Sequence, residues 1–530
     1  MPQAGPFPER SVQPDNVQVI FGLKLRQFRE AKGLGLKEMA ETAGLSPSYL
    51  NEIENGKKYP KSDKILQLAR ALQVSYDDLV SLKLDQELNS LSALLESPVI
   101  RELPLQLFGL SQHDIVALLT RAPHEAGALI RTLLDIARSY DMHVEHFFHA
   151  MLRSYQEAHD NYFADIEQAA RQFREQQGWP ADQTLAAGLL QEALERVFGV
   201  TVDETTLNDH PELGGFRSVW VAGPPHLMLL NGHLSPAQKA FQIGREIGYQ
   251  QMGLKERGIT SSRAEASSFD QVLNDFKASY FAGALLIDEG RLQLELAGLF
   301  AQERWDGERF LRLMTTYDVS PEMFLYRLTQ LIPRHFGLQQ LHFLRLSSAT
   351  GSDEYHLTKQ FNMSRVPIPT GIALNEHYCR RWLSVEVLQD LERQQQQGPA
   401  QAPLIGVQRS QFLDDGGEFF CIALARPLVL TPGTNTSVTL GFRLNDQFRQ
   451  AVRFWDDPAI PLRELNETCE RCPLQDCRER AAPPRMHEQK QTQEQRKAAL
   501  ATLIATCRAR LAPQPEARVL PAGKAARSAG

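Results

Sequence analysis

The sequence has no apolar run long enough to cross a membrane. The longest such run, from Phe419 to Leu430, spans about twelve residues and contains Arg426, whereas a membrane helix needs about twenty apolar residues. Residues 1–16 hold four prolines and no apolar stretch, unlike a secretory signal. We therefore expect the protein to stay in the cytoplasm.

The sequence also contains few cysteines and has a small net charge. Six cysteines in 530 residues cannot form a disulfide framework, and three of them fall within nine residues, which points to a metal. The net charge of −7 is small for this length, so it indicates no partner. A local basic face can still bind DNA, because phosphate attraction is screened and acts at short range.

Residues 17–82 have the pattern of five short helices separated by turns. The second helix stops at Gly44, and Ser46-Pro47 then supplies a side-chain cap and a proline at the first helical position. A short turn followed by a capped third helix is the helix-turn-helix arrangement. The apolar positions expected to form the core are Phe21, Leu25, Phe28, Met39, Ala40, Leu50, Ile53, Leu66, Ala69, Leu72 and Leu79.

The third helix is expected to present polar side chains to DNA. If Leu50 and Ile53 face the core, the other side of the helix points outward, where a recognition helix meets base edges. Asparagine pairs with adenine and glutamate accepts from cytosine, while flanking lysines neutralise phosphates and make binding salt-dependent. The candidate DNA-binding residues are Lys37, Ser46, Ser48, Tyr49, Asn51, Glu52, Lys57 and Lys58, with Lys61 as a further flanking lysine.

The run Ser46-Pro47-Ser48-Tyr49-Leu50-Asn51-Glu52-Ile53-Glu54 resembles the recognition helix of Cro/repressor-like (XRE) helix-turn-helix proteins. The resemblance covers roughly residues 18–82 and implies a structural ion pair between Arg29 and Glu54. Gly35 and Leu36 stand where that family usually has a Ser/Thr cap and a phosphate-binding glutamine.

Double-stranded DNA carrying an operator is the expected partner. Because one recognition helix reads only a half-site, we expect a homodimer or higher homo-oligomer on a palindrome. The alternative is a protein-binding module whose lysines form a solvated face.

The middle of the chain has β-prone runs such as residues 218–221, followed by helices near 236–252 and 268–287. Residues 240–249 resemble the active-site helix of ImmA/IrrE-type metallopeptidases, and residues 275–282 resemble the helix that supplies their third ligand.

The two zinc-binding histidines of such an enzyme are missing. A zinc peptidase needs histidines at i and i+4 with a glutamate between them to activate water, but Arg245 and Tyr249 occupy those positions. Arginine cannot deprotonate to bind zinc. We expect a degenerate scaffold that is no enzyme, with Glu246 solvated or ion-paired. The alternative is an active metalloprotease-type stress regulator.

Residues 340–445 contain several strand-like runs, among them 342–346 and 437–442, which suggest an antiparallel sheet with helices. The run from Gln394 to Gln397, followed by Gly398 and Pro399, has the composition of an exposed loop.

Cys469, Cys472 and Cys477 have a C-x2-C-x4-C spacing that can place three thiolates around one centre. The spacing alone does not decide between zinc and an iron–sulfur site. Cys379 is the best distant candidate for a fourth ligand, and Cys421 and His487 are weaker ones. The alternative is a set of ordinary free cysteines, as Cys421 and Cys507 are expected to be.

The order of parts is similar to the short-chain fatty acyl-responsive regulators. This resemblance implies control of propionate, acetate or glyoxylate metabolism, an acyl-coenzyme A effector and a [4Fe-4S] cluster held by the three clustered cysteines. It names no effector-binding residues. An iron–sulfur redox sensor, in which the cluster itself is the signal, is a further alternative.

We therefore expect a multidomain, mainly α chain, whose length suits about three to four domains. The expected parts are a disordered arm (1–16), the all-α helix-turn-helix domain (17–82), a helical connector (84–178), an α+β ImmA/IrrE-like domain (180–335), an α+β C-terminal sensor domain with the cysteine cluster (336–485), and a helix with a disordered tail (486–530).

Overall fold

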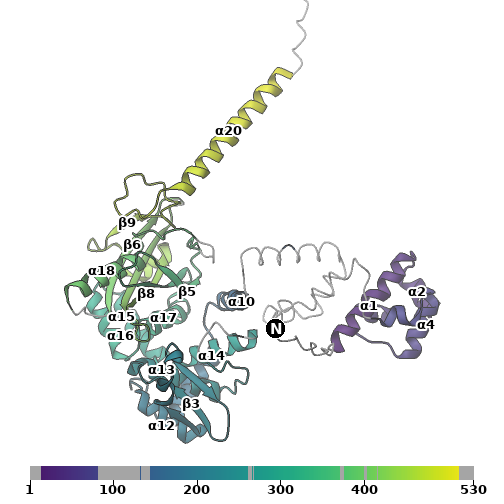
Figure 1. The fold of residues 1–530 in the computed structure, drawn as a ribbon, viewed down its shortest axis with the longest axis horizontal. Coiled ribbons are helices and arrows are strands. Elements are labelled where there is room, and N and C mark those ends of the chain that lie inside the picture. Colours follow the sequence, from purple (N-terminus) through teal and green to yellow (C-terminus); the bar gives the residue numbers. More distant parts are fainter. Residues whose placement is uncertain are drawn as a thin grey trace, which may run out of the picture.

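The computed structural model describes residues 14–81, 132, 144–260, 266, 268–369, 375–398, 403–414 and 416–511. Within these ranges, no helix combines the length and the apolar character that a membrane crossing requires. The chain is mainly helical, with a small sheet in its middle and a six-stranded sheet in its C-terminal part (Figure 1).

The N-terminal domain packs five short helices around a small apolar core. The buried stripe of the fourth helix consists of Ile65, Leu68, Ala69 and Leu72. Leu66 is 45% exposed, so its expected place in the core is wrong: at 3.6 residues per turn, it faces away from that stripe. The helices are α1 (Pro14–Ala31), α2 (Leu36–Ala43), α3 (Pro47–Glu54), α4 (Ser62–Leu72) and α5 (Tyr76–Val80).

Three expected segments fall wholly or partly outside the described residues. They are residues 1–13 of the N-terminal arm, residues 84–131 and 133–143 of the connector, and the tail at 512–530. The described remainder of the connector forms α10 (Val144–Ala158) and α11 (Ala164–Gln177).

The middle region contains a three-stranded sheet of order β1-β3-β2. β3 (His226–Leu230) pairs in parallel with β1 (Val200–Asp203) and antiparallel with β2 (Ser218–Val221). Against it pack α12 (Ala187–Phe198), α13 (Pro236–Gln251) and α14 (Phe269–Leu286).

Of the two glycines of α13 that face α14, Gly248 is the one that the close approach of the helices requires. A Cβ added at Gly248 would lie 2.9 Å from Phe281 Cδ1, and one at Gly244 would lie 3.4 Å from Ala282 Cβ. The close packing of the two helices brings Arg245 of α13 within hydrogen-bonding distance of Asp275 of α14.

The six-stranded sheet has the order β5-β4-β8-β7-β6-β9. Its pairs are antiparallel, as expected, except that β6 and β9 run parallel. The strands are β4 (Leu341–Ala349), β5 (His356–Asn362), β6 (Leu404–Phe412), β7 (Glu418–Pro427), β8 (Thr434–Arg443) and β9 (Leu462–Leu465).

Each face of this sheet packs into a different core, because successive side chains of a strand point to opposite faces. In β7, Phe420 and Ile422 join the core formed with α17 (Pro321–Phe336), whereas Phe419 and Cys421 join the core formed with α18 (Leu383–Gln397). The first core runs from Phe148 to Ile460, so the middle region and the C-terminal sheet share one continuous interior.

The glutamine run 394–397 is the last turn of α18, so the expected loop there is wrong. Apolar side chains of the preceding turns, such as Val387 and Leu391, anchor the helix, and it stops only at Gly398, whose φ is 154°. Glutamine is a good helix former and does not end a helix that is anchored in this way.

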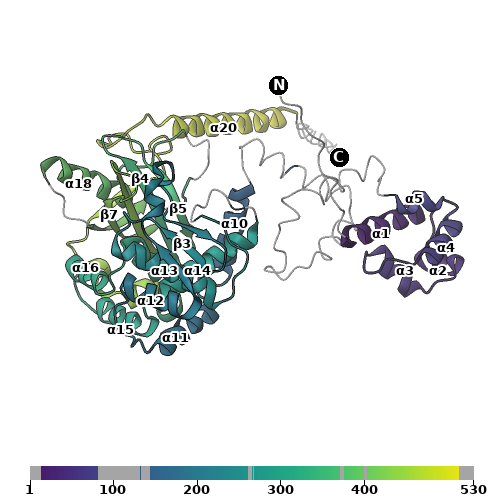
Figure 2. The same cartoon turned by 60° about the horizontal axis from the view of Figure 1, so that its bottom comes forward.

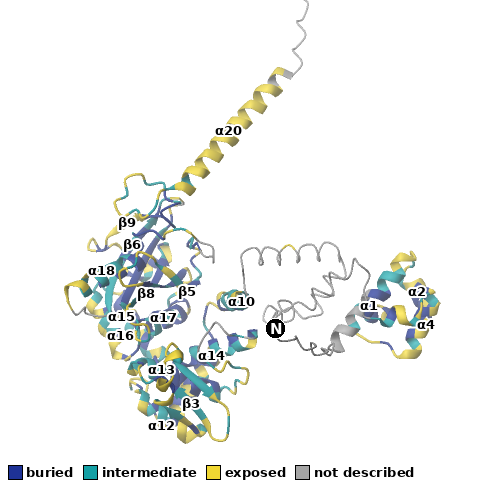
Figure 3. Cartoon of the chain, in the orientation of Figure 1, coloured by how far each residue is buried: buried dark blue, intermediate teal, exposed yellow. Residues whose placement is uncertain are grey.

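Helix α20 (Arg485–Leu511) extends away from the rest of the C-terminal part in both views (Figures 1 and 2). Nearly its whole length is exposed, in contrast to the buried sheet from which it departs (Figure 3). The remaining helices of the described chain include α15 (Glu289–Phe300), α16 (Gly307–Thr316) and α19 (Asp446–Ala451).

Candidate functional site

The recognition helix α3 begins where its cap predicts. Ser46 has extended φ/ψ angles and its Oγ accepts a hydrogen bond from the Tyr49 N–H at 3.1 Å. Leu50 and Ile53 are fully buried. The outer face of α3 is therefore fixed from behind by the domain core.

The candidate DNA-binding residues surround this outer face. Asn51 is exposed, and its Oδ1 accepts a hydrogen bond from Asn55 Nδ2 at 2.9 Å. Lys58 is exposed and its Nζ lies 2.7 Å from Glu52 Oε2. Of the others, Ser46, Ser48, Lys37, Lys57 and Lys61 are exposed and Tyr49 is half-buried.

Arg29 and Glu54 form the expected structural pair. Arg29 Nε and Nη2 donate to the two Glu54 carboxylate oxygens at 2.7 and 3.0 Å, and Nη1 donates to the Leu34 carbonyl at 2.9 Å. The hydrogen bond to Glu54 raises the pKa of Arg29 above its ordinary value. The pair ties α1 to the end of α3.

Helix α2 starts without a side-chain cap, because Gly35 has no side chain to provide one. Instead, the Gly35 N–H donates to Glu38 Oε2 at 3.4 Å.

The peptidase-like helix α13 places an ion pair where the resemblance would place zinc. Arg245 Nη2 donates to Asp275 Oδ1 of α14, and Nη1 donates to Gln242 Oε1 at 3.0 Å. Tyr249, at the second histidine position, donates from its OH to the same Asp275 oxygen at 3.4 Å. Burial raises the pKa of Tyr249 well above its ordinary value, so the phenol is neutral near pH 7.

The glutamate that would activate water is engaged elsewhere. Glu246 is 3% exposed and accepts two hydrogen bonds from Arg257, at 2.8 and 2.6 Å. The Arg257 guanidinium lies between the Trp220 and Tyr249 rings, 4.2 and 4.1 Å from their centroids. Glu246 is therefore ion-paired, one of the two arrangements expected for it.

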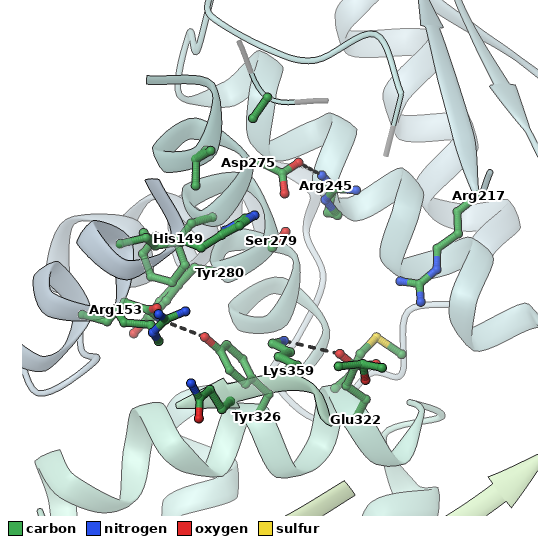
Figure 4. Close-up of a pocket in the computed structure, with 18 of the residues that line it drawn as sticks. His149, Arg153, Arg217, Arg245, Asp275, Ser279, Tyr280, Glu322, Tyr326 and Lys359 are labelled. Atoms are coloured by element: carbon green, nitrogen blue, oxygen red, sulfur yellow. Dashed lines mark hydrogen bonds and ion pairs between the residues drawn. The ribbon is translucent and has the colours of Figure 1, made fainter. Parts of the chain in front are cut away.

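A large cavity opens beside this constellation. Its volume is about 1410 Å³, and α10, α13, α14, α17 and β5 contribute to its wall. Figure 4 shows Arg245 and Asp275 on one side of the space, Glu322 and Lys359 on another, and Arg217 reaching in from the segment before β2. The cationic residues of the wall are Arg153, Arg217, Arg245, Arg257, Arg327, Lys359 and Arg426, and the acidic ones are Glu145, Asp275, Glu322 and Glu376.

No sequence pattern identified this cavity, because its wall combines segments from residue 145 to residue 426. From the sequence, Arg245 was interpreted only as a residue that cannot bind zinc.

The structure brings Cys379 to the cysteine cluster. A β-bridge joins Tyr378 to Thr468, and the Cys469 N–H donates to the His377 carbonyl at 2.9 Å. The Cys379 thiol interacts electrostatically with Cys469 and Cys472. Cys379, one of the candidates for a fourth ligand, therefore lies close in space to the clustered cysteines.

Backbone N–H groups surround the sulfur atoms. The Ala481 N–H donates to Cys469 Sγ at 3.4 Å, and the N–H groups of Asn466 and Arg381 donate to the Cys379 sulfur. Burial nevertheless raises the pKa of Cys379 to about 11, so without a metal this thiol is protonated at neutral pH.

Arg480 organises the loop that carries the three clustered cysteines. Its guanidinium donates to the carbonyls of Cys469 and Cys472, at 2.6 and 3.3 Å, and to that of Leu474. Within the loop, the fully buried Glu470 accepts from His377 Nδ1 at 2.8 Å.

All six cysteines are free thiols. In the described part of the chain, no three His, Cys, Asp or Glu side chains are arranged to hold a single metal ion. Cys421 is buried in β7 beside Ser410, and burial raises its pKa to about 12. Cys507 is exposed on α20, and His487 lies in the first turn of that helix.

Two family models match the chain. One, described as Helix-turn-helix, covers residues 25–79, and the other, described as an IrrE N-terminal-like domain, covers residues 196–329.

The chain is also similar to known regulators. The HTH-type transcriptional regulator RamB of Mycobacterium tuberculosis is 23% identical over 488 residues, which cover 87% of this chain and 94% of RamB. The propionyl-CoA carboxylase regulator of Cereibacter sphaeroides is 24% identical over 370 residues, 65% of this chain and 72% of that protein. The HTH-type regulator YazB of Bacillus subtilis is 38% identical over 60 residues, 11% of this chain and 87% of YazB.

With the capped recognition helix and the Arg29–Glu54 pair in place, these matches identify the chain as a member of the XRE-type helix-turn-helix family of DNA-binding transcriptional regulators, with an IrrE-like middle domain and a distant similarity to RamB over most of its length.

Proposed function

We propose that this regulator changes its affinity for DNA when a short-chain acyl-CoA, or a related metabolite of carbon metabolism, binds in the large cavity. The observation that carries the proposal is a cavity of about 1410 Å³ with seven cationic residues in its wall. Ligand cavities commonly measure about 300–1,000 Å³, so this one has room for an extended ligand such as a coenzyme ester. The relative named a propionyl-CoA carboxylase regulator supports the ligand class.

The wall also has the mixed character that such a ligand requires. Apolar side chains such as Phe241, Phe276 and Met323 line it together with the cations. An acyl chain and pantetheine arm would pack against the apolar part, and the phosphates would be drawn to the arginines.

Helix α10 offers a physical link to the DNA-binding domain. His149 and Arg153 of α10 line the cavity, and Phe148 anchors the helix against Phe269 of α14 with ring centroids 6.4 Å apart (Figure 4). The chain between α5 and α10 joins this wall to the recognition domain. A ligand that contacts α10 in one arrangement more than in another would shift the equilibrium between DNA-binding states.

A titration of full-length protein on a selected genomic duplex, with and without propionyl-CoA, tests this proposal. We expect at least a fivefold change in DNA affinity. Ser279→Trp, which fills the cavity from α14, should abolish the change and leave affinity without ligand intact, while Leu294→Trp at a 76% exposed position should behave as wild type. Unchanged affinity in the wild type with ligand contradicts the proposal.

The middle domain is proposed to be a scaffold without protease activity. Arg245 and Tyr249 replace both zinc-binding histidines, and Arg257 neutralises Glu246. The purified protein should contain no stoichiometric zinc in this domain, and Glu246→Gln should leave any proteolysis in the preparation unchanged. Proteolysis that disappears in Glu246→Gln would establish the metalloprotease alternative.

The cysteine cluster is proposed to hold a [4Fe-4S] cluster through Cys379, Cys469, Cys472 and Cys477. Four thiols and N–H donors to their sulfurs suit an iron–sulfur cluster. When bound, such a cluster would supply redox chemistry or a structural cross-link.

Anaerobically purified protein should show visible absorbance with matching iron and sulfide. Cys472→Ala and Cys379→Ala should lose it, whereas the exposed Cys507→Ala should keep it. Stoichiometric zinc without visible colour would favour the zinc alternative.

Glu376 and Tyr378, which flank the Cys379 segment, also line the cavity. This proximity favours a second candidate function in which the state of the cluster is itself the signal.

A homodimer is proposed as the DNA-bound form, since a single α3 helix reads one half-site. Light scattering of the protein–DNA complex should give two chains per palindromic duplex. One chain per duplex would contradict this.

A further inference from the structure

The Arg245–Asp275 ion pair occupies the position where the resemblance would place zinc. It leaves one nitrogen of the Arg245 guanidinium without a hydrogen-bond partner among the described residues. Arg245 is 9% exposed, with Nη1 bonded to Gln242 and Nη2 bonded to Asp275. Its Nε is buried and has no hydrogen-bond partner among the described residues. The side chain also lines the cavity wall.

The edge of the guanidinium formed by Nε and Nη2 is the one that matters for a ligand. Phosphate and carboxylate oxygens bind arginine most strongly through two parallel N–H donors. On Arg245, Nε is buried without a hydrogen-bond partner and Nη2 is bonded to Asp275. An incoming phosphate that binds side-on must therefore compete with Asp275 for Nη2.

Asp275 is the partner that can yield. Its side chain is 33% exposed, against 11% for Arg245, so it can turn toward solvent. Glu246, the other nearby carboxylate, is held by Arg257 and cannot neutralise Arg245 in its place. Figure 4 shows Arg217 entering the same space from another side, so a second cation faces the ligand.

We propose that the former zinc position has become an anion-binding subsite: Arg245 binds a phosphate group of the ligand, and Asp275 occupies the guanidinium until that phosphate displaces it. The inference rests on the proposed function for the identity of the whole ligand, but the subsite itself requires only a phosphate. The subsite thus binds an anion where the zinc enzymes bind a cation.

Substitutions of Arg245 and of Asp275 should have opposite effects on the affinity for the ligand. Isothermal titration of full-length protein with propionyl-CoA should give a Kd at least tenfold higher for Arg245→Gln and several-fold lower for Asp275→Asn, which removes the competitor. A purely structural ion pair would weaken binding in both variants. The exposed pair on α16, tested as Arg312→Gln and Glu308→Gln, should leave Kd unchanged.

Two further ligands distinguish a wrong phosphate assignment from a wrong effector. Propionyl-pantetheine, which has no phosphate, should bind wild type and Arg245→Gln equally, and an equal loss with both esters would overturn the phosphate assignment. If wild type binds no coenzyme ester, the proposed effector is wrong. Inorganic pyrophosphate then decides the subsite: it should bind wild type, bind Asp275→Asn more tightly and fail to bind Arg245→Gln. Any other order overturns the inference, and Asp275→Asn keeps it testable should Arg245→Gln not fold.

Discussion

Arg29 Nε lies 2.7 Å from Glu54 Oε1, and this contact joins the first helix of the DNA-binding domain to the last residue of its recognition helix. Both side chains are largely buried, at 11% and 5% exposure. Breaking one partner of a buried pair leaves an uncompensated charge and costs about 3–5 kcal/mol. The orientation of α3 therefore depends on a residue of α1 whose guanidinium donates to Glu54 and to the Leu34 carbonyl.

We expect Arg29→Ala to lower the free energy of unfolding of the N-terminal domain by about 3 kcal/mol. Hydrogen exchange of the α3 amides in the full chain measures this loss. Arg26→Ala breaks a more exposed pair with Glu30 and should change it by less than about 0.5 kcal/mol. Similar exchange rates in both variants would mean that the buried pair does not hold α3.

Asn51 and Lys58 should differ in what they contribute to DNA binding. Asn51 projects from the exposed face of α3, so Asn51→Ala should remove about 1–3 kcal/mol of discrimination between a selected duplex and random DNA. Lys58→Ala should weaken binding to both duplexes alike and reduce the salt dependence. Competition binding at several salt concentrations distinguishes them, and equal effects of the two variants on both duplexes would contradict the orientation of α3.

His342 should make the C-terminal sheet sensitive to acid. The imidazole is buried, and this burial lowers its pKa from the ordinary value of 6.5 to about 3. Between these values the unfolded chain binds a proton that the folded protein does not, so stability falls as the pH drops below about 6.5. The loss is on the order of 4 kcal/mol by pH 3.

Urea denaturation from pH 7 to pH 4 measures this slope. In His342→Asn, the free energy of unfolding should decrease less over this pH range, whatever its value at pH 7. Ser364→Ala removes the hydroxyl 2.9 Å from His342 Nδ1 but keeps the buried imidazole, so it should retain the slope. A His342→Asn variant as acid-sensitive as wild type would show that other groups control this dependence.

Two glycines of α13 offer a matched test of its packing on α14. Gly248→Ala places a Cβ 2.9 Å from the Phe281 ring and should destabilise the protein by about 1–3 kcal/mol. Gly244→Ala makes an ordinary 3.4 Å contact and should be neutral or stabilise the helix by up to about 1 kcal/mol. Thermal unfolding of both variants compares them, and equal losses would mean that the approach at Gly248 is not the tighter one.

Local patterns predicted the DNA-binding domain well. The Ser46 cap and the burial of Leu50 and Ile53 depend on residues within one or two helical turns, which the sequence displays directly. The composition of residues 394–397 led to a wrong prediction of a loop, because the apolar residues before them were not taken into account. The glutamines at 394–397 continue a helix that the apolar residues before them anchor.

Long-range packing could not be predicted in this way. Cys379 lies ninety residues before Cys469 in the sequence, and the bridge between Tyr378 and Thr468 brings the two segments together. From the sequence, Cys379 was the best distant candidate for a fourth ligand, but nothing there placed it beside the other three cysteines. The cavity could not be predicted for the same reason, because its wall combines helices, strands and loops from distant parts of the chain.

The amino-acid sequence alone determined the recognition helix and the loss of the zinc ligands, since both depend on which side chains occupy a few adjacent positions. The tertiary structure decided that Arg245 pairs with Asp275 in the wall of a cavity and that Cys379 joins the cysteine loop. These relationships arise from the packing of helices and strands far apart in the chain, and the periodicity of a single segment carries no information about which distant segment it will contact.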